Sequence, residues 1–334
     1  MVKTTAAVAL VVASMAVAAV SADPATNGNC VSGRFNFSNI APRVFYNKDA
    51  SRKNPPFPEA DRSLYDFTLD NGAENAKFDS NGMTITLTKQ IINGSNYAYG
   101  AQLSTNFYVN YGKITVSLSA PAEPGIVTTF YTMSAVKDEI DMEIVGKETT
   151  TIQSNVFYRG IPEFGVHMQR LTIPNSGAVN GMHQYTIDWN RNRLIWLIDG
   201  VPLRTLYKNQ SVSLMNTTKD PWYPTTPSII QMTCWDGGDV TSSPGTSTWA
   251  GGPPSWSVPN YQAVFQYLDI QCYDDNDNPV DVWPPNSAPT GTASGPQSTG
   301  TSAPGSKSGA PKLLQGSIAG AALLLGTLVF TWLL

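Results

Sequence analysis

Short stretches in which apolar and polar residues alternate recur through the central part of the chain. Clear examples are residues 83–88, 112–118, 184–189 and 193–198, and each is bounded by Gly, Asn, Asp or Pro. A period of two places successive side chains on opposite faces of a β-strand, and such turn-forming residues end strands. No stretch carries a long apolar stripe with helical spacing, and no repeat of fixed period argues for a propeller. We therefore predict an all-β sandwich or barrel of many short strands.

Two polar turns are expected near the end of this series. Residues 188–193 have the sequence Asp-Trp-Asn-Arg-Asn-Arg and predict a hairpin loop between two strands. Asp199 and Gly200 predict a second turn directly after the next strand.

The first 22 residues have the features of a secretory signal. Lys3 gives a short basic start, residues 6–20 are apolar, and Ser21 and Ala22 supply small residues before the cleavage point. The apolar run is too short to span a membrane, and a buried apolar helix is the alternative interpretation. We predict that residues 1–22 are a signal peptide.

The last residues predict attachment to a membrane. Residues 318–334 are apolar and no basic cluster follows them. Small residues precede this tail, which is the order of a glycosylphosphatidylinositol (GPI) attachment signal. We expect Ser308 to carry the anchor, with Gly305 or Ser306 as alternatives, and residues 309–334 to be removed. A retained membrane-spanning helix is the other interpretation, and both place the protein outside the cell on a membrane.

Composition divides the remainder into a stalk and one folded domain. Residues 286–308 are rich in Ser, Thr, Pro and Gly and cannot bury enough surface to fold, so they predict a flexible stalk. Residues 23–285 are enough for one large core. Charged residues are 14% of the chain and the net charge is -4, which indicates neither a nucleic-acid groove nor a polybasic membrane surface.

Sequons and cysteines suit an oxidising, secreted environment. Glycosylation is expected at the four N-x-S/T sequons Asn36, Asn93, Asn209 and Asn216. The three cysteines, Cys30, Cys234 and Cys272, allow one disulfide with one thiol left over, and their spacing matches no zinc site. Cys30 with Cys272 is favoured because the first and last strands of sandwiches are often neighbours, although the sequence leaves the pairing open.

An acidic run is the main candidate for chemistry. In a strand Glu139, Asp141 and Glu143 share one face, while Ile140 and its apolar neighbours at 142 and 144 enter the core. Three acids on one strand face repel each other, so stability alone gives little reason for this pattern.

Glycosidic-bond cleavage supplies such a reason. Cleavage with retention needs a carboxylate nucleophile and a carboxylic acid that protonates the leaving oxygen, with the carboxyl groups about 5 to 5.5 Å apart. Residues i and i+4 of a strand have Cα atoms ~13 Å apart, and two Glu side chains that lean together close most of that gap. A solvated acidic face is one alternative. A calcium site is another, although calcium ligands usually come from loops.

The run resembles the active-site strand of glycoside hydrolase family 16. That resemblance implies that Glu139 is the nucleophile, Asp141 the assisting acid and Glu143 the acid/base. Further segments across most of residues 60–273 are similar to the same family, namely 112–114, 124–130, 153–155, 183–189, 198–200, 222–224, 235–239 and 248–252. The resemblance implies a concanavalin-like β-jelly roll of two antiparallel sheets with a concave substrate cleft.

Together with the GPI-type tail, the sequence is most similar to the fungal Crh-like branch of this family. This resemblance implies a cell-wall transglycosylase that joins chitin to β-glucan, located on the extracellular face of the plasma membrane or in the wall.

Aromatic side chains are candidates for a sugar platform, because sugar rings stack on them. Trp235 is favoured because it precedes Asp-Gly-Gly where a strand leaves the sheet, and Trp249 and Trp189 are further candidates. Gln153 and Asn155 alternate on a strand expected beside Glu143 and are candidates for binding sugar hydroxyls. The alternative interpretations are core aromatics and ordinary exposed polar residues. Neither His167 nor His183 lies near a plausible nucleophile, and His183 is interpreted as structural.

Three functions are consistent with these features. A retaining transglycosylase is favoured over an endo-β-1,3(4)-glucanase that uses the same residues, since only the resemblance separates them. A carbohydrate-binding lectin would need the aromatic platform but not the three acids. We expect no cofactor or metal, no nucleic-acid partner, and a monomer.

Overall fold

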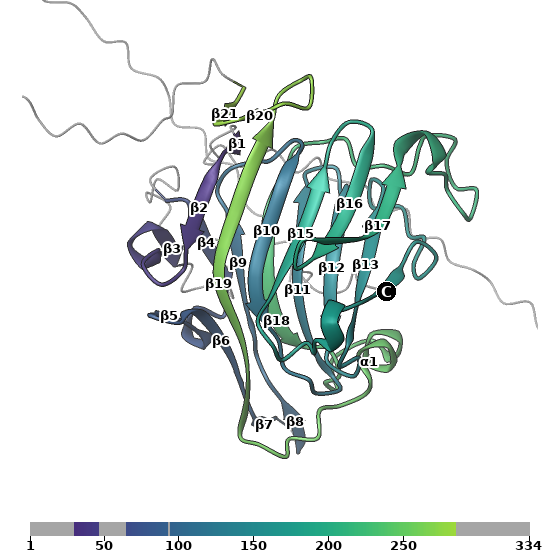
Figure 1. Ribbon diagram of the computed structural model, residues 1–334. Helices are drawn as coiled ribbons and strands as arrows, with labels where there is room; N and C mark the ends of the chain where they lie inside the picture. Colours follow the sequence, from purple (N-terminus) through teal and green to yellow (C-terminus); the bar gives the residue numbers. More distant parts are fainter. Residues whose placement is uncertain (1–29, 47–64, 93, 285–334) are drawn as a thin grey trace, which may run out of the picture.

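Two large β-sheets pack face to face in the computed structural model, which describes residues 30–46, 65–92 and 94–284 (Figure 1). Apolar side chains from both sheets form one core, for example Ile140 and Met142 from one sheet and Trp196 from the other. The all-β sandwich prediction is confirmed. The predicted signal peptide, the stalk, the anchor site at Ser308 and the sequon Asn93 lie outside the described residues.

The first sheet has eight strands and contains the acidic run. Its order is β14-β13-β12-β11-β18-β9-β4-β3, and all its pairs are antiparallel except β3 with β4. Its strands are β3 (Val44–Tyr46), β4 (Phe67–Asn71), β9 (Ala101–Thr105), β11 (Ile126–Ser134), β12 (Glu139–Val145), β13 (Thr151–Phe157), β14 (Gln169–Thr172) and β18 (Ser228–Asp236).

The second sheet has nine strands and covers the other side of the core. Its main path is β17-β16-β15-β10-β19-β6-β5, and β2 and β20 also pair with the long strand β19. Its strands are β2 (Gly33–Asn36), β5 (Ala76–Asp79), β6 (Gly82–Thr88), β10 (Gly112–Ser119), β15 (His183–Trp189), β16 (Arg193–Ile198), β17 (Val201–Tyr207), β19 (Asn260–Tyr273) and β20 (Pro279–Val280).

Short elements complete the described part of the chain. The pairs β1 (Cys30–Val31) with β21 (Val282–Trp283) and β7 (Gln90–Ile92) with β8 (Ser95–Tyr97) form two-stranded sheets. The α-helix α1 (Pro244–Ala250) begins after Ser243, whose side chain accepts a hydrogen bond from the Thr246 amide. Single turns of 3-10 helix are η1 (Ala41–Arg43), η3 (Ala73–Asn75), η4 (Pro174–Ser176) and η5 (Lys208–Gln210). No helix of the described residues is long and apolar enough to cross a membrane.

The predicted hairpin and turn both form. Asn190 Oδ1 accepts hydrogen bonds from the amides of Asn192 (2.9 Å) and Arg193 (2.8 Å), which closes the loop between β15 and β16. Asp199 and Gly200 adopt positive φ angles of 51° and 78° and reverse the chain into β17.

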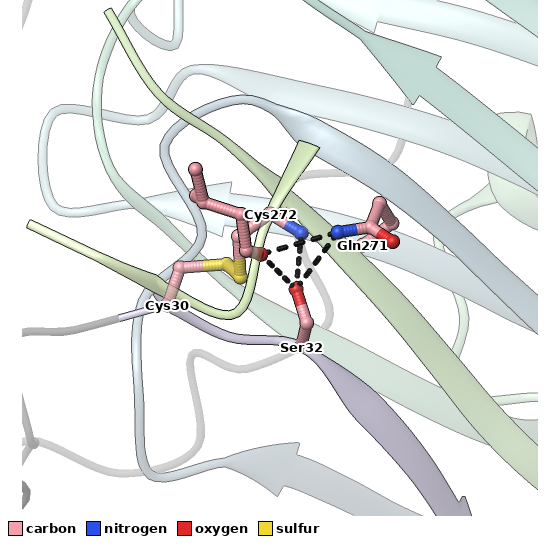
Figure 2. The surroundings of a disulfide bond; sticks show 5 residues. Cys30, Ser32, Gln271 and Cys272 are labelled. Carbon is pink, nitrogen blue, oxygen red and sulfur yellow. Dashed lines mark hydrogen bonds between the residues drawn. A yellow bond between two sulfur atoms is a disulfide. The ribbon is translucent and has the colours of Figure 1, made fainter. Parts of the chain in front are cut away.

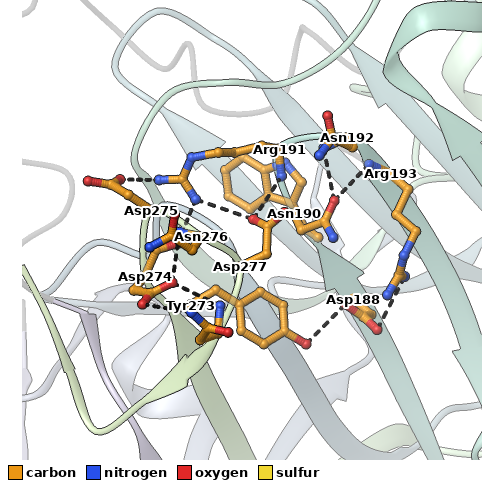
Figure 3. Close-up of polar contacts among 12 residues, drawn as sticks. Asp188, Asn190, Arg191, Asn192, Arg193, Tyr273, Asp274, Asp275, Asn276 and Asp277 are labelled. Carbon is orange, nitrogen blue, oxygen red and sulfur yellow. Dashed lines mark hydrogen bonds and ion pairs between the residues drawn. The ribbon is translucent and has the colours of Figure 1, made fainter.

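The same hairpin loop is tied to the end of β19 (Figure 3). Arg191 Nη1 donates to the Asp274 carbonyl (2.6 Å), and its guanidinium pairs with Asp275 and with Asp277 (3.3 Å). Nearby, the Tyr273 hydroxyl donates to Asp188 Oδ1 at 3.1 Å. These contacts join segments that are more than 80 residues apart in sequence.

A disulfide joins the two ends of the described region. Cys30 in β1 bonds to Cys272 in β19, as the sequence favoured, and Cys234 is a buried free thiol. Ser32 Oγ accepts from the Cys272 amide (2.8 Å) and from Gln271 Nε2 (3.2 Å) beside the bond (Figure 2). The bond therefore holds β1 against the end of the sandwich.

Replacing both Cys30 and Cys272 by Ser is expected to lower the free energy of unfolding by about 3–5 kcal/mol, because a very long loop is no longer closed in the unfolded chain. Urea unfolding of the variant and of the unreduced parent protein measures this. The matched control is Cys234→Ser, which removes the thiol outside the disulfide. An unchanged midpoint in the double variant would show that the bond does not stabilise the sandwich.

Candidate active site

Strand β12 places the three acids on the face of its sheet that is turned away from the core. The strand lies between β11 and β13, near the middle of the eight-stranded sheet. Ile140, Met142 and Ile144 belong to the core cluster. Because side chains alternate along a strand, the intervening acids Glu139, Asp141 and Glu143 lie together on the opposite face.

Pairing with neighbouring strands gives each acid a definite surrounding. Glu143 lies opposite Thr129 and Gln153, and Asp141 lies opposite Tyr131 and Asn155. Glu139 lies opposite Met133 and Phe157. None of these paired residues is charged at neutral pH. The acids therefore interact mainly with each other across the strand face.

The acids are shielded from solvent. The exposed fractions are 9% for Glu139, 1% for Asp141 and 3% for Glu143. This burial raises the pKa of Glu139 well above its usual range, and the Asp141 charge and a hydrogen bond with Asp141 add to the effect. Burial also raises the pKa of Glu143, again with a contribution from the Asp141 charge. A raised pKa lets a carboxyl group keep its proton to higher pH, as an acid that protonates a leaving group requires.

Asp141 behaves differently from its two neighbours. Burial raises the pKa of Asp141 to about 7, although the hydrogen bond with Glu139 and the positive charge of Arg204 oppose this rise. Asp141 is thus the member of the set whose ionised form receives the most support. Among the described residues, Asp141 Oδ2 and Glu143 Oε1 have no hydrogen-bond partner, so both oxygens remain available to a ligand.

A buried cation lies behind the acidic strand. Arg204 of β17 donates from Nη1 to the Ser154 carbonyl (2.8 Å) and from Nη2 to the His167 carbonyl (2.8 Å). Its guanidinium lies 4.2 Å from the centre of the Trp196 ring, and Trp196 Nε1 donates to the Asp141 carbonyl at 3.0 Å. Burial lowers the pKa of Arg204 to about 10, so the side chain is charged at neutral pH.

The Arg204 charge leads to a prediction about pH dependence. In Arg204→Gln the pKa of Asp141 should rise, because a cation that stabilises its ionised form is lost. The acidic limb of the pH profile, which reports the ionisation of an acid that activity needs, should then move to higher pH by about half to one pH unit. Arg204→Lys keeps the charge and should leave the limb in place. The other groups coupled to the acids, Tyr131 and Lys137, are the same in both variants.

A pH profile of kcat/KM for the two variants and the parent tests this prediction. Gln and Lys both offer hydrogen-bond donors to the carbonyls of Ser154 and His167, so the comparison isolates charge. Equal shifts in both variants would mean that Arg204 acts only through structure.

Two tryptophans pack together next to the acids, and 7% of Trp235 is exposed while Trp249 is half-buried. Trp235 and Trp249 stack with ring centres 6.4 Å apart and planes inclined by 27°. They pack with Val127 and Ala250 in a small apolar cluster separate from the main core. Val127 lies opposite Val145, two residues after Glu143 on the same strand face. A sugar ring that rests on these indoles would therefore lie beside Glu143.

Gln153 and Asn155 occupy the same face on β13. Gln153 lies opposite Glu143, and its Oε1 accepts from Trp249 Nε1 at 2.9 Å. Asn155 lies opposite Asp141, and its Oδ1 accepts from the neighbouring Val156 amide at 2.9 Å. The structure thus gathers Trp235, Trp249 and these two residues around the acids.

The prediction that Trp189 binds substrate is wrong. Its side chain is fully buried in the core, contacts Tyr111 edge-on at 4.9 Å, and donates from Nε1 to the Pro224 carbonyl. Trp189 follows Tyr185 and Ile187 on the inward face of β15, in the other sheet. The strand's period of two therefore directs it into the core, although a polar loop follows it in sequence.

A row of polar side chains was missed by the sequence analysis. The Tyr131 hydroxyl lies 3.4 Å from Gln102 Oε1, and Gln102 Nε2 donates to Asp70 at 3.0 Å. Gln231 Nε2 donates to Ser104 Oγ (2.9 Å), which also bonds to Asp70. The row extends from the acids across β11, β18 and β9 to β4. Alternating polar residues in otherwise apolar strands were the available signal.

Asp138 was also missed, although it immediately precedes Glu139. It is fully buried, and its carboxylate accepts from the amides of Arg159 (3.1 Å) and Thr225 (2.9 Å) and from the Thr226 hydroxyl (2.7 Å). These bonds fix the start of β12 against two other segments. The sequence alone presents Asp138 as one more acid of the run.

The remaining predicted residues lie away from the acids. The described sequons Asn36, Asn209 and Asn216 are exposed, and glycosylation there stays a prediction. His183 bonds to Asp199 Oδ2 (2.7 Å) and the Ala178 carbonyl (3.1 Å), which agrees with a structural role.

Comparison with known proteins defines the class. Residues 64–251 match the glycosyl hydrolases family 16, and the chain belongs to that family. It is 29% identical over 272 residues to Crh-like protein 2 of Aspergillus fumigatus, an alignment that covers 74% of this chain and 58% of the relative. It is 30% identical over 264 residues to Crh-like protein 3 of Botryotinia fuckeliana, covering 74% and 57%. The chain therefore spans less than two thirds of the length of these relatives.

A solved structure supports the fold. The Crh5 transglycosylase in complex with NAG superimposes with a TM-score of 0.57 at 24% identity, over 76% of this chain and 87% of that one. This likeness agrees with the two-sheet sandwich described above.

Proposed function

We propose that this chain is a retaining transglycosylase that remodels fungal cell-wall polysaccharide by transferring chitin to β-glucan. The observation that carries the proposal is the set Glu139, Asp141 and Glu143, which share one buried strand face with raised pKa values in a family 16 chain. The Crh-like relatives and the transglycosylase with a similar fold favour transfer.

The reaction would proceed in two displacements. In the first, a Glu139 carboxylate oxygen attacks the anomeric carbon while the Glu143 carboxyl gives its proton to the departing glycosidic oxygen. The products are a covalent glycosyl ester on Glu139 and a shortened donor chain with a free hydroxyl. In the second, Glu143, now ionised, takes the proton of an acceptor hydroxyl as that oxygen displaces Glu139.

Each acid has a role that follows from its surroundings. Glu143 has a raised pKa, and its Oε1 has no hydrogen-bond partner within residues 30–46, 65–92 and 94–284, which suits a proton donor. Asp141 hydrogen-bonds to Glu139, so it can hold the proton that Glu139 must give up before attack. The positive charge of Arg204 stabilises the resulting negative charge on the set.

The rest of the strand face would bind sugars. Trp235 and Trp249 offer stacking surfaces beside Glu143, and the polar row that begins at Tyr131 offers hydroxyl and amide groups on the other side. Aromatic surface combined with a few polar groups is the usual composition of a glycan site.

Two other functions remain as alternatives. An endo-β-1,3(4)-glucanase would use the same residues with water in place of the acceptor. A lectin would bind glycans on the same face without cleavage, but three mutually repelling buried acids would then have no purpose.

The setting of the protein belongs to the same proposal. Residues 23–285 would form the catalytic domain, held outside the cell by the stalk 286–308 and a GPI anchor at Ser308 after removal of residues 1–22 and 309–334. Such a monomeric, secreted glycoprotein would meet wall polymers directly, and no nucleic acid or cofactor enters the reaction.

The test is a transfer assay with protein produced through a fungal secretory pathway. The enzyme is incubated with chitin or β-1,3-glucan and a fluorescently labelled oligosaccharide acceptor, beside Glu139→Gln. Label that enters polymer only with the parent enzyme supports the proposal. Shortened donor without labelled polymer indicates the glucanase, and binding without any change in the glycans indicates the lectin.

A further inference from the structure

Glu148 is a partly buried acid outside the catalytic set with an unusually complete set of partners. It lies in the turn between β12 and β13, and its side chain is 12% exposed. Oε2 accepts from Arg170 Nε (2.9 Å) and Thr151 Oγ1 (2.9 Å), and Oε1 accepts from Gln153 Nε2 (2.8 Å). Burial raises its pKa, but these three donors outweigh burial and lower it, so Glu148 is an anion at neutral pH.

An anion in this place fixes the orientation of Gln153. An ionised carboxylate can only accept hydrogen bonds, so the Gln153 amide must turn its NH2 group towards Glu148. The Gln153 carbonyl oxygen then faces the other way, where it accepts from Trp249 Nε1 at 2.9 Å. Gln153 is 1% exposed and lies opposite Glu143 in the strand register. It therefore links Glu148 to an indole beside the catalytic acid.

The link reaches the aromatic surface. The Trp249 indole is stacked on Trp235, and stacking alone does not determine which way the indole is flipped about its Cβ–Cγ bond. A hydrogen bond at Nε1 fixes that orientation. A second contact with helix α1 comes from the turn itself, where Lys147 Nζ donates to the Thr248 carbonyl at 3.3 Å. The turn between β12 and β13 thus sets both the position and the orientation of Trp249.

We propose that Glu148 is a positioning residue that, through Gln153, orients Trp249 for binding the sugar next to Glu143, and so controls how well an acceptor glycan competes with water. The inference rests on the proposed function. It also changes the expected role of Gln153, which transmits orientation to Trp249 and is not primarily a ligand for sugar hydroxyls. Glu143 exchanges its proton with the leaving and the incoming sugar, so a surface beside it acts on the acceptor.

Glu148→Gln tests the relay with a near-isosteric side chain. A neutral amide can donate as well as accept, so it no longer dictates which way Gln153 points. We expect the KM for the acceptor to rise about five- to tenfold, and the ratio of transfer to hydrolysis to fall by a similar factor. Release of an activated aryl leaving group, which reports formation of the glycosyl ester, should stay within about twofold. Glu74→Gln, the same change at an exposed site in η3, is the matched control.

A double-mutant cycle decides whether Glu148 and Trp249 act together. Trp249→Phe keeps a ring but removes the N–H, so it should reproduce the acceptor defect, and adding Glu148→Gln to it should cause little further loss. Additive losses, an unchanged acceptor KM in Glu148→Gln, or equal losses in ester formation and acceptor use would each overturn the relay. If the parent enzyme neither transfers nor cleaves, the proposed function fails, an outcome distinct from failure of the relay.

Thermal unfolding of every variant provides the structural control. Glu148→Gln weakens charge-assisted bonds, so some loss of stability is expected. If Glu148→Gln is too unstable to assay, the comparison of Trp249→Phe with Gln153→Leu carries the test, since both break the same bond from opposite sides. Equal acceptor defects support the relay, and a normal acceptor KM in either one contradicts it.

Discussion

Glu139→Gln is expected to lower both transfer and hydrolysis by at least about 10³- to 10⁵-fold, because an amide cannot form the glycosyl ester. Gln has nearly the shape of Glu, and its side-chain NH2 group can donate to Asp141 as the protonated Glu139 carboxyl does. The substitution should therefore leave glycan binding largely intact. Product release from an unactivated oligosaccharide donor measures the loss, and binding of the same oligosaccharide by calorimetry measures what remains.

Stability separates this loss from unfolding. The pKa of Glu139 is raised in the folded protein. A raised acid favours folding below its ordinary pKa, and this contribution is lost as pH rises through the folded pKa. Glu139→Gln removes that pH-dependent loss, so the variant should unfold at a higher temperature than the parent, and by more at pH 7 than in acid. An inactive variant that also melts early would leave the nucleophile assignment without support.

The local pattern along each strand was sufficient to predict the fold class and the face on which the acids lie. Alternation is a property of single strands, so it placed Ile140 and its neighbours in the core and Glu139, Asp141 and Glu143 opposite them. The same pattern exists at Trp189, but there the prediction rested on the residue being aromatic, and the period of two directs the side chain inwards. Trp189 is in phase with Tyr185 and Ile187, so the alternation along the strand favours a core position for it.

Contacts between distant segments were not predictable in the same way. Arg204 approaches the acids from the opposite sheet, and Gln153, which bonds to Glu148, also bonds to Trp249 across 96 residues of sequence. Nothing in the neighbourhood of either residue in sequence indicates such a partner, because both contacts depend on how strands and sheets are arranged. The Cys30–Cys272 disulfide was partly predictable. The first and last strands of a sandwich are often neighbours, which favoured this pairing, but the sequence left the other pairings open.

These distant contacts explain how one strand can carry three acids. The strand face itself offers little to offset their repulsion, since no basic side chain of the part of the chain that the structure describes hydrogen-bonds to them there. A cation behind the sheet supports the ionised form of Asp141, while burial keeps protons on its neighbours. The arrangement therefore favours an ionised Asp141 between a protonated Glu139 and a protonated Glu143. It does so without placing a positive charge on the strand face where we propose that sugar binds.

Glu143→Gln is expected to give a loss that depends on the leaving group. With a natural glycan the first step needs a proton from Glu143, so the rate should fall by about 10²- to 10⁴-fold. With a dinitrophenyl glycoside the leaving group departs without a proton, and the first step should be nearly unaffected, so that the glycosyl ester accumulates on Glu139. A burst of dinitrophenol equal to the enzyme concentration, followed by slow turnover, is the expected signature.

The pH profile of the same variant completes the assignment. The parent enzyme needs Glu143 protonated in the first step, so its rate should fall as pH rises through the raised pKa of that group. Glu143→Gln has no such proton and should lose this alkaline limb while it keeps the acidic limb set by Glu139 and Asp141. Small anions such as azide, which attack the ester without a general base, should restore turnover of the activated substrate and yield a glycosyl azide. A variant that retains the alkaline limb, or that shows equal losses with both leaving groups, would exclude Glu143 as the acid/base and direct the search to another proton donor on this strand face.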